Sequence, residues 1–120
     1  MSDNLTSRDL RIGNLIFNEY GIVSTIVEVT DYDRVAVGNN RVVTDLVNCE
    51  PIPLTEEWLL KFGFKLKSDA DGEYYENSGV NILILRSDDI HFFFGNPNTK
   101  DKYVHQLQNL YFALTQKELL

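Results

Sequence analysis

The sequence predicts an α+β fold in which a small SH3-like β-barrel is followed by a short helix, an antiparallel meander and a C-terminal amphipathic helix. Three observations predict it. Residues before position 50 are dense in Val, Ile and Thr, a capped helical segment follows two prolines, and the last residues have a helical period. We expect a barrel lobe over residues 1–53 and an α-β-β-β-β-α lobe over residues 54–120, folding together as one compact unit.

The first half of the chain is predicted to form four short strands. Turn-forming clusters at 18–21, 31–33 and 38–40 interrupt a run rich in β-branched and aromatic residues. The strands expected around these turns span residues 12–17, 22–30, 34–37 and 41–47. Short strands joined by tight turns are typical of a small barrel, and Cys49 is expected to be a small buried strand residue in it.

The stretch EPIPLTEEWLLKFGF predicts the junction and the first helix. Pro51 and Pro53 hold the chain extended and cannot donate ladder hydrogen bonds. Thr55 is a suitable N-cap for a helix over 56–62, because acidic residues follow it in the first turn, where the helix dipole favours negative charge. Gly63 is placed to end this helix in a left-handed conformation.

After Gly63 the chain returns to a two-residue period. Four strands of a meander are expected in FKLKSD, EYYEN, VNILILRS and IHFFFGN. The intervening DADGE is interpreted as a solvated hairpin turn and not as a calcium loop, because position 12 counted from Asp69 is Val80 instead of a glutamate. No metal site or cofactor is predicted.

The strand IHFFF divides its residues between two faces. Ile90, Phe92 and Phe94 share one face, which we expect to pack beneath a helix. His91 and Phe93 share the other. Either both side chains form an exposed contact surface, or Phe93 packs against the barrel and His91 is solvated at a strand edge.

The closing stretch YVHQLQNLYFALTQKELL predicts an amphipathic helix, with Asn98, Thr99 or Asp101 as its N-cap. At the helical period, the core stripe consists of Tyr103, Leu107, Leu110 and Leu114. The opposite face is polar but nearly uncharged, and it carries His105, Gln108, Asn109 and Phe112. Such a composition favours the core of an interface, although the barrel or the C-terminal tail could equally cover Phe112.

Charge and composition exclude several classes of function. Eighteen acidic residues against eleven basic ones give a net charge of −7, and no segment clusters Lys and Arg, so direct binding to nucleic acid or to an anionic membrane is disfavoured. An acidic balance suits docking onto a basic surface of another protein. No apolar stretch has the length of a signal peptide or a bilayer span, which predicts a cytoplasmic location.

Three stretches of the chain resemble the sequence blocks of a family. LRIGN, EPIPLTEEWLLKFGF and YVHQLQNLYFALTQKELL are similar to blocks of small uncharacterised accessory proteins of bacterial, prophage and bacteriophage genomes. The resemblance implies a genomic setting, that of a small accessory protein on a mobile element. It implies no activity, and it carries no site residue over to this chain.

Three hypotheses about function are consistent with the sequence. The first is a non-enzymatic, protein-binding inhibitor of a host defence complex, such as an anti-CRISPR-like inhibitor of an RNA-guided nuclease. Its apolar anchors are His91, Phe93, His105 and Phe112, with Gln108 and Asn109 on the same helix face. Its charged surface is expected in turns and includes Asp31, Asp33, Asp69, Asp71, Asp88 and Asp89.

The other two hypotheses are a small-ligand module and an enzyme. A module that sequesters a nucleotide signal needs a glycine-rich loop or converging cations, and the chain has only short candidates for either. An enzyme needs a nucleophile with its base or a metal with three ligands, and two histidines with one cysteine show no spacing typical of either. A homodimer would use the uncharged helix face equally well.

Overall fold

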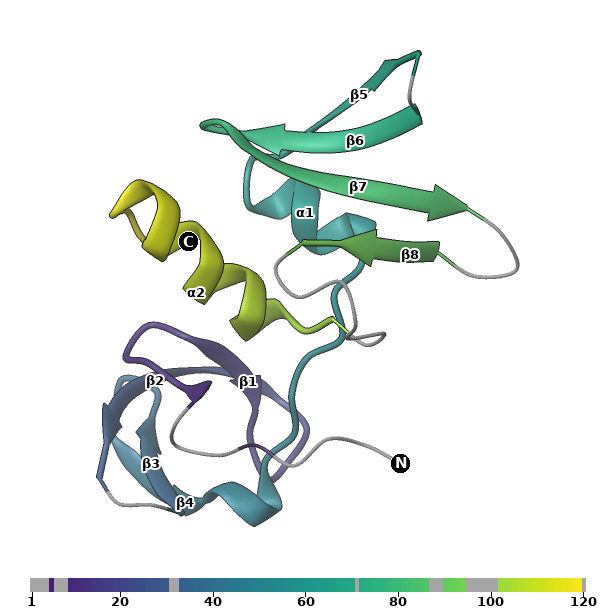
Figure 1. Cartoon of the computed structure of the whole chain (residues 1–120). Coiled ribbons are helices and arrows are strands. Elements are labelled where there is room, and N and C mark those ends of the chain that lie inside the picture. Colours follow the sequence, from purple (N-terminus) through teal and green to yellow (C-terminus); the bar gives the residue numbers. More distant parts are fainter. Residues whose placement is uncertain are drawn as a thin grey trace.

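The structure is a computed structural model, which describes residues 5, 9–30, 33–70, 72–86, 90–94 and 102–119. It has an α+β fold with two antiparallel four-stranded sheets and a C-terminal helix, α2 (Val104–Thr115). Figure 1 shows α2 lying between the N-terminal sheet and the second sheet. The predicted α+β class and the order of its elements are confirmed at this level.

The N-terminal sheet consists of β1 (Leu15–Phe17), β2 (Val23–Val29), β3 (Arg34–Val37) and β4 (Val42–Asp45), paired in that order. A bulge between Ile26 and Glu28 bends β2, and Ile26 is fully buried. A single bridge joins Phe17 to Glu50, but no continuous ladder closes this sheet among the described residues. The lobe is therefore an open four-stranded meander with its own small core.

The end of this lobe differs from its prediction. The strand expected to continue to residue 47 ends at Asp45, and a 3₁₀ turn over Leu46–Asn48 follows. Cys49 comes after this turn and is buried, as expected, but it is not in a strand. A backbone hydrogen bond explains why the strand ends early. The Leu46 amide donates to the Asp33 carbonyl, and the chain then turns away from the strand direction.

The junction and helix α1 (Glu56–Lys61) follow the sequence prediction closely. Thr55 is the N-cap, and its hydroxyl accepts a hydrogen bond from the Trp58 amide at 3.4 Å. Gly63 has φ = 86°, a left-handed conformation that glycine adopts without strain. The extended junction pairs with the start of α2, since the Val104 amide donates to the Ile52 carbonyl at 2.9 Å.

The second sheet is a meander of β5 (Lys65–Asp69), β6 (Gly72–Asn77), β7 (Val80–Arg86) and β8 (Ile90–Phe93). Its inner face contributes to the larger core, which α1 and α2 complete from one side. The predicted face of β8 is confirmed for Phe92 and Phe94, which are buried, whereas Ile90 is exposed beside the end of β7. The buried residues from the sheet and helices include Leu59, Phe64, Tyr75, Ile82, Phe92, Val104 and Leu107.

Helix α2 begins and ends differently from its prediction. Asn98, Thr99 and Asp101 lie outside the described residues, and Tyr103 is the N-cap, with its amide donating to Gln106 Oε1 at 2.9 Å. Tyr103 and Leu107 are buried as predicted and Leu110 is half-buried, but Leu114 is exposed. The chain turns back at Gln116, which has φ = 62°, and Leu119 enters the core instead.

Candidate functional site

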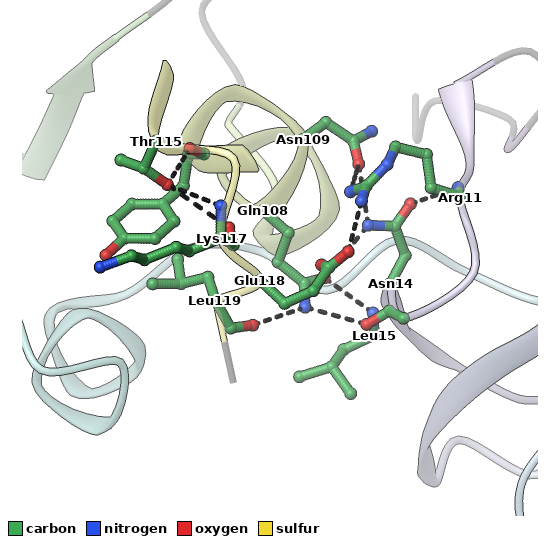
Figure 2. A network of polar contacts seen from close by, with 11 residues as sticks. Arg11, Asn14, Leu15, Gln108, Asn109, Thr115, Lys117, Glu118 and Leu119 are labelled. Atoms are coloured by element: carbon green, nitrogen blue, oxygen red, sulfur yellow. Dashed lines mark hydrogen bonds and ion pairs between the residues drawn. The ribbon is translucent and has the colours of Figure 1, made fainter. Parts of the chain in front are cut away.

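The uncharged face of α2 is covered by the N-terminal lobe of the same chain. His105 is 4% exposed and Gln108 is 1% exposed. Gln108 Oε1 accepts a hydrogen bond from the Leu15 amide at 2.8 Å, and its Nε2 donates to the carbonyls of Gly13 and Leu119 at 3.1 and 3.2 Å (Figure 2). Both functional groups of this amide are therefore satisfied inside the molecule.

Asn109 and Phe112 extend this contact toward the edge of the lobe. Asn109 Oδ1 accepts from the Asn14 side chain at 2.9 Å and from Arg11 at 3.1 Å, and its Nδ2 donates to the Asp9 carbonyl at 2.8 Å. The Arg11 guanidinium lies 4.1 Å from the centre of the Phe112 ring and also pairs with Glu118. These residues hold the lobe, the helix and the tail together.

The covering of this face corrects one expectation about the site. His105 and Gln108 are enclosed by this chain and present no surface to another protein, while Asn109 and Phe112 are half-buried. Of the alternatives for Phe112, the structure shows cover from the N-terminal lobe, through Arg11. The physical reason is that side-chain amides can hydrogen-bond to the backbone groups of Gly13 and Leu15 as well as they could to a partner protein.

His91 and Phe93 lie elsewhere, on the face of the second sheet turned away from the helices. Both are exposed, as one of the two interpretations expected. Register places Tyr74 opposite Leu83 and Leu83 opposite Phe93, so these three side chains form one row across β6, β7 and β8. Leu85 stands opposite His91 in the next row. We call this group the outer sheet face: Tyr74, Leu83, Leu85, His91 and Phe93.

The outer sheet face is apolar at its centre and charged at its rim. Leu83 is 54% exposed, Leu85 52% and Phe93 40%. On the β5 side, Lys67 lies opposite Tyr74 and its ammonium pairs with Glu76 at 2.9 Å. An exposed apolar group with a polar rim is the usual anatomy of an interaction surface.

Sequence reasoning missed Tyr74, Leu83 and Leu85. Their signal was present in VNILILRS, where Ile82 and Ile84 alternate with two leucines, so both faces of the strand are apolar. A strand with one solvated face would alternate with polar residues instead. The pairing of Phe93 with Leu83, which makes the surface continuous, depends on the register between β7 and β8.

The acidic residues proposed for a charged surface are only partly described. Asp88 and Asp89 lie outside the described residues, as do Asp31 and Asp71. Three arginines pair with carboxylates of the same chain, Arg11 with Glu118, Arg41 with Glu28, and Arg86 with both Glu56 and Glu73. These pairs neutralise three arginines within the molecule, so the net negative charge of the chain comes from its other acidic side chains.

A cluster of ionisable side chains joins α1 to the second sheet. Nη1 and Nη2 of Arg86 each donate to one carboxylate oxygen of Glu56 at 2.8 Å, and the Tyr75 hydroxyl donates to Glu56 at 2.5 Å. Hydrogen bonds from Arg86 and then Tyr75 lower the pKa of Glu56, while burial and the bond to Glu56 raise the pKa of Tyr75 to about 12. Neither group is poised to exchange a proton near neutral pH, so this cluster fits a structural role.

Other candidates for chemistry are weak in the described part of the chain. Burial raises the pKa of the Cys49 thiol, which disfavours the reactive thiolate. No group of three His, Cys, Asp or Glu side chains among the described residues is placed to hold a metal ion. No helix within the described ranges is long and apolar enough to cross a membrane.

Comparison with protein-family models, curated proteins and solved structures finds no match to this chain.

Proposed function

We propose that this protein is a non-enzymatic protein-binding module that docks through its outer sheet face. The supporting observation is the row of half-buried Tyr74 and exposed Leu83 and Phe93, with exposed Leu85 beside it, on a face of the sheet that the helices leave open. Aromatic and aliphatic side chains at the centre of an interface supply most of its binding energy, and the charged rim excludes water.

The charge of the chain favours a partner with a basic surface. The net charge is −7, and internal pairing of Arg11, Arg41 and Arg86 leaves carboxylates elsewhere unbalanced. Such a field accelerates association with a basic protein or ribonucleoprotein and repels free nucleic acid. The outer sheet face then provides short-range contacts after electrostatic attraction has brought the partners together.

LRIGN and the two longer blocks resemble phage and prophage accessory proteins, which supports the proposal that this module is encoded on a mobile element. We propose that it acts in the host cytoplasm as an anti-CRISPR-like inhibitor, and that it docks on the basic nucleic-acid channel of an RNA-guided nuclease. We also propose that the N-terminal lobe is an SH3-like unit. Its four consecutive antiparallel strands and the bridge from Phe17 to Glu50 support that interpretation.

A small-ligand module is the second candidate, supported by a pocket of about 210 Å³ in the N-terminal lobe. A nucleotide needs cations or several free backbone amides around its phosphates. The residues that line this pocket include no Lys, Arg or His, so a phosphate-bearing ligand fits it poorly. An enzyme is the third candidate, with no reaction class favoured by the described side chains.

The experiment that tests the docking surface compares two variants with the wild type. The double variant Leu83→Ser/Phe93→Ser removes the centre of the outer sheet face, and Leu60→Ser removes an equally exposed leucine from α1 as the matched control. Binding is measured by biolayer interferometry against a panel of purified RNA-guided nuclease complexes, at two salt concentrations. We expect the double variant to bind roughly 30-fold or more weakly, and the control to bind as the wild type does.

Two results would contradict this proposal. One is undiminished binding by the double variant when its melting temperature matches that of the wild type, because the partner would then use another face. The other is a concentration-dependent dimer, seen by analytical ultracentrifugation, that the same double variant abolishes. That result would assign the outer sheet face to a second copy of this chain.

A further inference from the structure

The N-terminal lobe contains a pocket between two turns that the docking proposal does not use. Glu19 and Tyr20, in the turn between β1 and β2, line one side. Asn39 and Asn40, in the turn between β3 and β4, line the other, and the buried Val37 also lines the pocket. Its volume of about 210 Å³ is large enough for the end of one long side chain and too small for a whole cofactor.

The wall that carries Glu19 and Tyr20 is built in advance of any binding. Asn18 Oδ1 accepts hydrogen bonds from the amides of Tyr20 and Ile22 at 2.8 and 3.0 Å, and its Nδ2 donates to Ser24 Oγ at 3.2 Å. The Gly21 amide donates to the Asn18 carbonyl at 2.9 Å, and Gly21 has φ = 75°. This closed turn fixes the backbone that presents the carboxylate and the phenol ring, so little order must be gained on binding.

The chemistry of the lining selects for a cation. Glu19 makes no ion pair with any described residue, and Tyr20 is 78% exposed, so its ring is accessible to a ligand. The amides of Asn39 and Asn40 add carbonyl oxygens that accept hydrogen bonds. Glu19 is the single charged residue of the lining, which contains no Lys, Arg or His, so a positively charged group finds a counter-charge here and an anion does not.

Between the two cationic side chains, this lining matches arginine better than lysine. A guanidinium offers five donors in one plane and stacks on an aromatic ring, whereas an ammonium is a compact and strongly hydrated charge. We propose that the pocket binds the guanidinium group of an arginine side chain, with Glu19 as its counter-charge and Tyr20 as its stacking surface. We assign this arginine to the basic surface of the partner protein, and this assignment rests on the proposed function.

The test is an NMR titration of the full, ¹⁵N-labelled chain with N-acetyl-arginine methylamide. The matched control ligand is N-acetyl-citrulline methylamide, which has the same shape without the charge. We expect saturable shifts of backbone amides in residues 18–24 and 37–44, with the citrulline compound binding roughly tenfold or more weakly. Equal affinity for the two compounds, or shifts that do not include residues 18–24, would overturn the proposal.

Variants identify the counter-charge. Glu19→Gln is expected to weaken binding of the arginine compound roughly fivefold, while Glu57→Gln, a carboxylate in the first turn of α1, leaves it unchanged. An unchanged affinity in Glu19→Gln would overturn the assignment. The two proposals can fail separately. If the arginine compound binds but no nuclease complex does, the pocket is supported and only the proposed function is contradicted. A complex that forms equally well with Glu19→Gln contradicts only the arginine contact to the partner.

Discussion

His105 is buried at the start of α2, and its Nδ1 atom has no hydrogen-bond partner within the described part of the chain. Its ring stacks on Tyr103, with 6.0 Å between ring centres. Burial lowers the pKa of His105 from its ordinary value of 6.5, and the charge of Asp9 opposes that effect in part. This side chain is therefore neutral in the folded protein at neutral pH.

The lowered pKa of His105 predicts a pH dependence of stability. Below about pH 6.5 the unfolded chain binds a proton at this position more readily than the folded chain, so the free energy of unfolding decreases as pH falls. The lowered pKa values of Glu56 and Glu76 act in a separate, more acidic window, below the ordinary carboxyl value of 4.5. We expect urea unfolding to show lower stability at pH 5.5 than at pH 7.5.

His105→Phe, which keeps a ring in the stack, should remove most of that difference, and the exposed His91→Gln should leave it in place. A difference of equal size in the wild type and in His105→Phe would contradict the assignment.

At the scale of the element, α2 depends on the tail that follows it. Thr115 Oγ1 donates to the Tyr111 carbonyl at 2.7 Å and accepts from the Lys117 amide at 3.1 Å, which turns the chain back toward the core. Leu119 is then buried, and its carbonyl accepts from Gln108. The tail thus supplies a core residue to the helix that precedes it.

The burial of Leu119 predicts a large effect for a short side chain at that position. Leu119→Ala should lower the free energy of unfolding by about 2–5 kcal/mol, because it removes apolar contacts and leaves a cavity. Leu114→Ala, at an exposed position of α2, should change it by less than about 0.5 kcal/mol. Urea unfolding measures both. Equal effects of the two variants would show that the tail does not pack against the core.

At the scale of the whole molecule, α2 joins two cores. Its apolar face, with Val104 and Leu107, belongs to the core of the second sheet, and its amide face binds the loop before β1. The N-terminal lobe has a separate cluster around Ile16, Ile26 and Val35. Because the bonds of Gln108 cross between these units, we expect the chain to unfold in one cooperative step.

Two probes test this cooperativity. Trp58 fluorescence reports on the second lobe, since it is the single tryptophan of the sequence, and the amide signals of Ile26 and Val35 report on the N-terminal lobe. Their urea transitions should coincide.

Gln108→Ala should lower the free energy of unfolding by about 1–3 kcal/mol, because it leaves buried backbone groups unsatisfied.

Asn81→Ala, an exposed amide in β7, is the matched control and should have little effect. Two separate transitions in the wild type would show that the lobes unfold independently.

Signals within short stretches of the chain predict the kinds of elements and their order. Thr55 and Gly63 delimit α1, the prolines mark the junction, and alternation predicts the strands, because each of these signals acts between residues close in the chain. The same alternation correctly separated His91 and Phe93 from the buried Phe92 and Phe94. The pattern of β7 also indicated that Leu83 and Leu85 lie on a second apolar face. It does not show which residues of the neighbouring strands lie beside them.

Which faces of these elements are covered depends on contacts between residues far apart in the chain. Periodicity shows that α2 has an apolar face and an amide face, but it does not show that Gln108 meets Asn14, a residue 94 positions away. Burial of a polar face depends on distant backbone groups whose positions follow from the assembly of both sheets. For the same reason the row from Tyr74 to Phe93, and the pocket beside Glu19, exist only once strand register and the two turns are in place.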